Sequence, residues 1–138
     1  MAATEFVPNQ AKTEAITAHV IWLTTGLSCE GDSVAMTGAT NPSLEDIITG
    51  AIPGMPRVVV HNTVLAVEMG DDFMQAWYDA EEGKLDPFVL VLEGSVPNEN
   101  INGDGYWTGM GVNPANGQPI TTNEWIDRLA PKAAAVVA

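Results

Sequence analysis

The sequence predicts a doubly wound α/β fold, in which helices cover both faces of a parallel sheet. Four short, unbroken apolar runs occur at residues 19–23, 57–61, 88–92 and 134–138. Such runs are typical of strands that are buried on both faces of a parallel sheet. Segments with helical periodicity lie between them, and the alternation of strand and helix indicates parallel crossover connections.

Start and stop signals place the first two helices. Residues 41–48 read Asn-Pro-Ser-Leu-Glu-Asp-Ile-Ile, which predicts a capped start and a short helix that ends at Gly50. The second helix is expected to be capped by Asp71 or Asp72 and to end at Gly83, because its apolar residues recur at helical spacing between these points.

A capping box predicts the third helix. Thr121 and Glu124 have the required spacing, residues 125–130 supply the buried stripe, and Pro131 ends the helix. The stretch 98–119 is rich in Gly and Asn, and we expect it to form a hairpin or an extended loop that contacts a partner.

Composition and charge allow one domain and exclude several classes of partner. The chain has 138 residues, 46% of them apolar, which is enough for a single core. Eighteen acidic residues against five basic ones give a formal charge of −13, which repels nucleic acid and anionic lipid. No segment approaches the roughly 20 apolar residues of a membrane helix, and no signal sequence is evident. We therefore expect a cytoplasmic protein that reaches a membrane only through partners.

The chain has one cysteine, Cys29, and it lies in the loop that follows the first predicted strand. Asp32 stands three residues later, and Gly26 and Gly31 flank the pair. Ligands of doubly wound sheets bind at the carboxyl ends of the strands. The thiol and the carboxylate are therefore expected to point at one ligand, close to which the glycines let the backbone approach.

Structural roles are the alternative for these residues. A lone Cys after a strand is more often a small buried hydrophobe. Asp32 would by default bond its own backbone in a turn. Glu93, which with Gly94 follows the third predicted strand, can hold the backbone of its loop, and His61 is expected to be a hydrogen-bonded residue at a strand end rather than a ligand.

Four segments resemble the small subunit of nickel-iron hydrogenases. They are residues 22–34, with the pattern Trp-Leu-x-x-Gly-x-x-Cys-x-Gly-Asp-Ser-Val, 41–48, 93–97 and 125–130. The resemblance covers residues 1–138 as the flavodoxin-like N-terminal domain of that subunit. The C-terminal cluster-binding portion is absent, so the sheet is expected to be truncated after its fourth strand.

The resemblance also implies a cofactor. Most of the family has Cys-x-x-Cys in the first loop, and both thiolates bind the proximal [4Fe-4S] cluster. Here the second position is Asp32, a departure similar to the actinobacterial-type high-affinity hydrogenases. Cys29 and Asp32 thus match two of four ligand positions, with the other two beyond Ala138, and Gly26, Gly31, Glu93 and Gly94 are expected beside the cluster.

The same resemblance implies a partner. The nickel-iron centre would lie in a separate large subunit that oxidises H2, and this chain would carry the electrons away through the proximal cluster. No nickel or iron ligand of that centre is expected in this chain.

Two other functions remain open. Residues 24–28 resemble the hydroxyl-rich phosphate loop of flavodoxins, but such a loop needs a helix to begin at once, and the next predicted helix starts at Ser43. A non-catalytic interaction domain would instead use the stretch 98–119, with Tyr106 and Trp107 as its contact residues.

Overall fold

The computed structural model of the chain describes residues 16–25, 35, 38–62, 70–101 and 109–138. Within these ranges it contains one parallel sheet, one antiparallel strand pair and three helices with defined bounds. No helix in the described part is long and apolar enough to cross a bilayer.

A parallel sheet forms the centre of the fold, and each of the four predicted apolar runs supplies one of its strands. The order across the sheet is β2-β1-β3-β6. The strands are β1 (Thr17–Thr24), β2 (Arg57–Asn62), β3 (Phe88–Glu93) and β6 (Ala135–Val137). Counting only these strands, the order matches the first four positions of the flavodoxin-like arrangement. The predicted α/β class is therefore confirmed.

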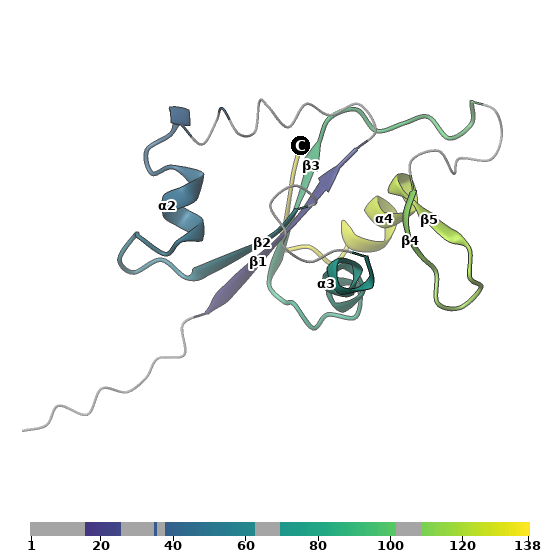
Figure 1. Cartoon of the computed structure of the whole chain (residues 1–138), viewed down its shortest axis with the longest axis horizontal. Coiled ribbons are helices and arrows are strands. Elements are labelled where there is room, and N and C mark those ends of the chain that lie inside the picture. The colour runs from purple at the N-terminus through teal and green to yellow at the C-terminus, as the bar shows by residue number, and fades with distance from the viewer. Residues whose placement is uncertain (1–15, 26–34, 36–37, 63–69, 102–108) are drawn as a thin grey trace, which may run out of the picture.

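Helices lie on both sides of this sheet, as Figure 1 shows. They are α2 (Leu44–Ile48), α3 (Asp71–Glu81) and α4 (Thr122–Leu129). The short helix α2 packs on β2 on one face, and α3 and α4 lie together on the other. Helical backbone also occurs at Ala35, Gly38 and Ala39. The prediction that the next helical residues after β1 start at Ser43 is therefore wrong.

The two faces of the sheet are buried to different extents. Alternate residues of β1 and β3 point towards α3 and α4 and are fully buried there, in one cluster with the two indoles of Trp77 and Trp125. These strand residues are Ile21, Leu23, Phe88 and Leu90. The intervening residues face the α2 side and are only half-buried. The expectation of strands covered on both faces is thus correct for one face only.

The sequence signals predict the cap of α2 correctly and the cap of α3 incorrectly. Ser43 caps α2 in a complete capping box, because its hydroxyl accepts from the Asp46 amide and the Asp46 carboxylate accepts from the Ser43 amide, both at 3.1 Å. Helix α3 is capped by Gly70 with φ of 62°, and no side-chain hydrogen bond caps it among the described residues. The predicted cap at Asp71 or Asp72 is therefore wrong. Both carboxylates lie inside the first turn, where the helix dipole favours negative charge.

Only half of the predicted capping box forms at α4. The Thr121 hydroxyl accepts from the Glu124 amide at 3.2 Å, as expected. The Glu124 carboxylate instead forms an ion pair with Arg128, one turn further along the helix. A competing cation within reach thus removes the second bond of the box.

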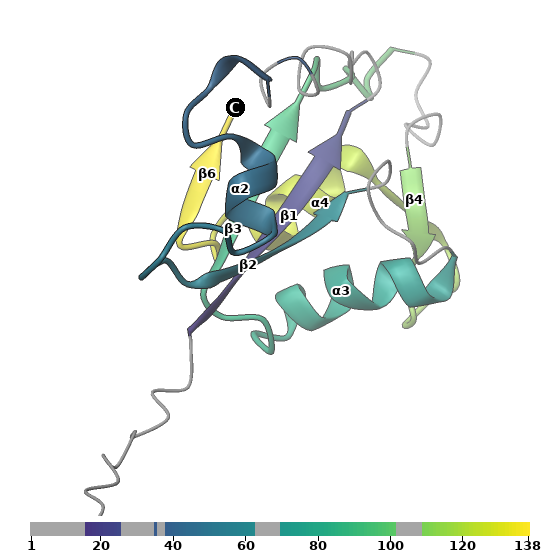
Figure 2. The same cartoon turned by 60° about the vertical axis from the view of Figure 1, so that its left-hand side comes forward.

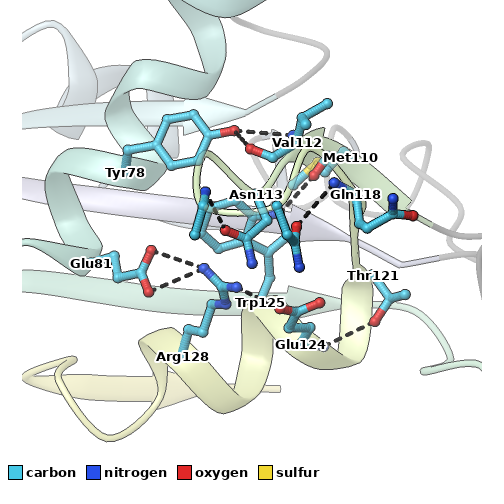
Figure 3. A network of polar contacts seen from close by, with 12 residues as sticks. Tyr78, Glu81, Met110, Val112, Asn113, Gln118, Thr121, Glu124, Trp125 and Arg128 are labelled. Carbon is cyan, nitrogen blue, oxygen red and sulfur yellow. Dashed lines mark hydrogen bonds and ion pairs between the residues drawn. The ribbon is translucent and has the colours of Figure 1, made fainter.

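Within the described part of the 98–119 stretch, residues 109–119 belong to a hairpin, which is one of the two forms expected for this stretch. Its strands are β4 (Gly109–Val112) and β5 (Pro119–Thr121), which pair antiparallel. Figure 3 shows how two aromatic side chains attach it to the helices. The Tyr78 hydroxyl donates to the Val112 carbonyl at 2.7 Å and accepts from the Val112 amide at 3.1 Å. The Trp125 indole donates to the Met110 carbonyl at 2.8 Å.

Candidate functional site

The strand order places a topological switch point between β1 and β3. The connection after β1 leads to β2 at one end of the strand order, whereas the connection after β3 leads towards β6 at the other end. Ligands of open α/β sheets bind where neighbouring connections leave in opposite directions, outside the carboxyl ends of the strands. Thr24 and Glu93 are register partners at the ends of β1 and β3, and Figure 2 shows these two strands side by side and pointing the same way.

The predicted site residues fall partly outside the described residues. Cys29, Asp32, Gly26 and Gly31 lie between Thr25 and Ala35 in the sequence, and residues 26–34 are outside the described part of the chain. Their predicted roles stay predictions. Because both ends of β1 and β3 are described, the structure does establish that this loop starts at the switch point.

Hydrogen bonds between described residues join the ends of β1 and β3 at Glu93. Its carbonyl accepts from the Thr25 amide at 2.9 Å and from the Thr25 hydroxyl at 2.8 Å. Its carboxylate accepts from the Trp22 indole N–H at 2.9 Å. Glu93 therefore holds the backbone where the two loops begin, which is the structural role considered for it from the sequence. Its predicted place beside a cofactor is not tested by these bonds.

Gly94 turns the chain away from the end of β3. It has φ of 86°, a region that residues with a Cβ rarely adopt. The glycine is thus required by the backbone path itself, and that requirement explains its position without a cofactor.

A buried hydroxyl lies at the same edge. The Oγ1 atom of Thr24 is inaccessible to solvent and has no hydrogen-bond partner in the part of the chain that the structure describes. Leaving such a group unpaired costs about 1–3 kcal/mol. Its presence fits a site that binds a polar or charged group beside the switch point.

Sequence reasoning placed Thr24 and Thr25 in a possible phosphate loop and Trp22 in a family pattern, but it did not predict how these residues shape this edge of the sheet. The bond from Trp22 to Glu93 spans 71 residues, so no local pattern indicates it. The composition of the strand did contain a signal. An indole and two threonine hydroxyls stand at the carboxyl end of an apolar run, and such groups need hydrogen-bond partners when they are buried.

His61 lies near the end of β2 and is hydrogen-bonded, as predicted. Its ring Nε2 lies 3.0 Å from the ring Nδ1 of His19 on the neighbouring strand. Among the described residues, no group of three or more His, Cys, Asp or Glu side chains is placed to hold a metal ion. Cys29 and Asp32 lie outside the described residues, so their role as metal ligands stays a prediction.

Comparisons with known proteins were made for the whole chain. No protein-family model matches it. Among curated proteins, it is 33% identical over 124 residues to the periplasmic [NiFeSe] hydrogenase small subunit of Desulfomicrobium baculatum. The match covers 88% of this chain and 36% of that protein.

Solved structures give a second set of matches. An actinobacterial-type NiFe-hydrogenase from Ralstonia eutropha H16 is 59% identical with a TM-score of 0.78, over 87% of this chain and 35% of that one. The reduced, active Ni-Fe-Se hydrogenase from Desulfomicrobium baculatum is 29% identical with a TM-score of 0.66, over 88% and 41%. The chain thus spans about a third of the length of the curated relative that it matches.

Proposed function

We propose that this chain, which is similar to part of the small subunit of nickel-iron hydrogenases, transfers electrons within a hydrogenase complex. The observation that carries the proposal is the 59% identity to an actinobacterial-type enzyme over 87% of the chain. The carboxyl edge of the sheet, with its switch point between β1 and β3, supports a cofactor site at the loop after β1.

We propose Cys29 and Asp32 as two of the four ligands of a proximal [4Fe-4S] cluster, which supplies reversible one-electron transfer when it is bound. The donor chemistry fits, because such clusters are held by anionic ligands, usually thiolates. A carboxylate is harder and releases less charge to iron than a thiolate does. Asp32 is therefore expected to raise the reduction potential relative to four-thiolate ligation.

The chain's own contribution at this edge is to hold the loop ends in place. The Thr25 bonds to the Glu93 carbonyl fix the start of the first loop against the end of β3. The indole of Trp22 holds the Glu93 carboxylate. The unpaired hydroxyl of Thr24 supports a polar occupant beside it. Gly26, Gly31 and Gly94 are proposed to give the backbone close access to that occupant.

The proposed partner is a catalytic large subunit that contains the nickel-iron centre and oxidises H2. Exposed apolar side chains follow β3 towards the hairpin and fit a protein interface there; they are Val96, Ile101 and Val112, which are 45%, 60% and 51% exposed. Tyr106 and Trp107 of the same stretch lie outside the described residues. Hydrogen exchange in the complete complex should show protection across 98–119, and unchanged exchange there would contradict this interface.

We propose a cytoplasmic location, with membrane association only through partners. The relative from Desulfomicrobium baculatum is described as periplasmic, so the two compartments are real alternatives. Fractionation of cells that express the complete complex separates them, since recovery with periplasmic markers would contradict the cytoplasmic assignment.

Substitution of the two proposed ligands tests the function directly. In the complete small subunit with its partner, Asp32→Cys is expected to keep the cluster and lower its midpoint potential, because a thiolate donates more charge to iron. Cys29→Ala is expected to lose or degrade the cluster. The measurement is a redox titration followed by electron paramagnetic resonance.

Ser33→Cys is the matched control, since it adds a thiol one residue away from the proposed ligand position. It should leave the spectrum and the midpoint as they are in the parent protein. If Asp32→Cys also leaves both unchanged, Asp32 is a turn residue and the ligand assignment is wrong.

A further inference from the structure

The two histidines of the chain lie together on neighbouring strands. His19 is in β1 and His61 in β2, where Val59 is the register partner of His19 and Ile21 that of His61. Alternate residues of a strand share a face, so both imidazoles are on the face of the buried Ile21, towards α3 and α4. Both side chains are half-buried.

The geometry of the pair defines a linear hydrogen bond. His19 Nδ1 and His61 Nε2 are 3.0 Å apart, the ring centres are 5.3 Å apart, and the ring planes differ by 12°. For a given N···N distance, the two ring centres are farthest apart when both lie on the line through the two nitrogens. The observed separation of the centres is this largest value, so the line between the nitrogens passes through both ring centres. The rings are therefore nearly coplanar and meet edge to edge rather than face to face.

A proton between the two nitrogens fits this geometry, and a metal ion does not. Two Zn–N bonds of about 2.0–2.1 Å each would separate facing nitrogens by about 4 Å. In a neutral pair one ring donates its N–H and the other accepts. An imidazolium ring has two donors and no acceptor. The bond therefore survives the first protonation of the pair, which makes it charge-assisted, and cannot survive the second.

The cationic side chain of Arg57 acts on His19 of the histidine pair. Arg57 belongs to the same face of β2, two register positions before Val59. The pKa of His19 is lowered from its ordinary value of 6.5, first by burial and then by the positive charge of Arg57. On β3, the register partner of His19 is the buried and apolar Phe88. Among the described residues, Arg57 is thus the charged group that acts on His19.

We propose that His19 and His61 form a proton-operated latch between β1 and β2. The latch is closed while the pair holds at most one extra proton, and it opens when both rings are cationic and face each other beside Arg57. Among the strands that the structure describes, β2 is at one end of the sheet order and pairs with β1 alone. Opening the latch therefore loosens β2 before the central strands. This inference does not rest on the proposed electron-transfer function.

The sign of the pH dependence follows from the pKa of His19. Because its pKa is lower in the folded chain, the unfolded chain binds more protons between that pKa and 6.5. Stability is therefore full above about pH 6.5, and it declines as the pH falls from there towards the folded pKa.

Imidazole titration by nuclear magnetic resonance in the 138-residue chain tests the latch. The two rings should titrate as a coupled pair in which the second proton binds at a pH well below 6.5. Arg57→Gln should shift this second step upwards, whereas the charge-conserving Arg57→Lys should not. Independent titration of both rings near 6.5, or equal effects of the two Arg57 variants, would overturn the proposal.

Amide hydrogen exchange, corrected for the intrinsic rate at each pH, tests the opening of the strand. Between pH 8 and pH 5, the protection of residues 58–62 should fall. The expected fall is about tenfold for each unit by which folding lowers the pKa values of the two histidines. Protection of residues 89–92 in β3 should change less. In the double variant His19→Gln, His61→Gln the acid-dependent fall should disappear. A fall that persists there, or equal loosening of β2 and β3 in the parent chain, would contradict the latch.

Discussion

The hydrogen bond from Trp22 to Glu93 is predicted to stabilise the fold at the switch point, and Trp22→Phe removes it. The indole N–H donates to the carboxylate at 2.9 Å, and the contact is partly buried. Hydrogen bonds to charged groups contribute about 1.5–3 kcal/mol. Water can partly replace the donor at a half-buried site, so we expect the free energy of unfolding to fall by about 1.5–2 kcal/mol.

Glu93→Gln gives the second arm of a double-mutant cycle. The amide oxygen can still accept from the indole, but the bond loses its charge assistance and with it about half of its strength. We expect a loss of about 1 kcal/mol from this variant. In the double variant the bond is already absent, so the two losses should fall short of additivity by about 1 kcal/mol.

Urea unfolding of the 138-residue chain, followed by tryptophan fluorescence and by circular dichroism, measures these differences. With a urea slope of about 2 kcal/mol/M, Trp22→Phe should lower the unfolding midpoint by about 0.8–1 M. Circular dichroism is the reference signal because the substitution removes one of the fluorophores.

Trp77→Phe is the matched control for the cycle. The Trp77 indole is fully buried, and its N–H has no hydrogen-bond partner among the described residues. Its replacement should cost stability through lost packing but should be additive with Glu93→Gln. A coupling energy below about 0.3 kcal/mol between Trp22 and Glu93 would refute the reasoning, because independent sites add within that margin.

Three further predictions concern the hairpin and the cluster. Tyr78→Phe should lower stability by about 1 kcal/mol and speed amide exchange at Val112, because two exposed hydrogen bonds are lost; unchanged exchange would contradict the attachment. Gly109→Ala should distort the hairpin, since its Cβ would lie 2.8 Å from the Ile120 carbonyl oxygen, whereas Gly38→Ala, with nothing within 4 Å, should be tolerated; equal unfolding midpoints would contradict this. The isolated 138-residue chain should hold no stable cluster after incubation with iron and sulfide, because it supplies two of four proposed ligands; chelator-resistant iron in stoichiometric amount would count against it.

The sheet was predictable from sequence because its strands are continuous apolar runs with clear breaks between them. Local signals also located α2, where the side chains of Ser43 and Asp46 each accept from the backbone amide of the other residue within one turn. The same kind of signal failed at α3, because the sequence offers two carboxylates as caps and the N-cap is instead Gly70, the residue before both of them. It failed in part at α4, because Arg128 competes for the carboxylate that would complete the box.

The site was predictable to a lesser extent, and for a different reason. Cys29 and Asp32 stand out by residue type and by resemblance to a family, without any knowledge of the fold. The residues that hold the loop ends do not stand out, because their bonds join strands that are far apart in the chain. Trp22 and Thr25 reach Glu93 only after β1 and β3 have paired in register. Such contacts follow from topology, which the local pattern of each strand does not contain.

The unequal burial of the sheet shows the limit of the apolar pattern itself. Continuous apolar strands indicate that both faces can be buried, and the pattern contains no information on what covers each face. Towards α3 and α4, large aromatic side chains complete a core in which Leu90 is fully buried. On the other face α2 is five residues long and has no buried residue, so Val89 and Val91 stay half-buried. The coverage of a face thus depends on the length and position of its helices, and those are set by the connections rather than by the strands.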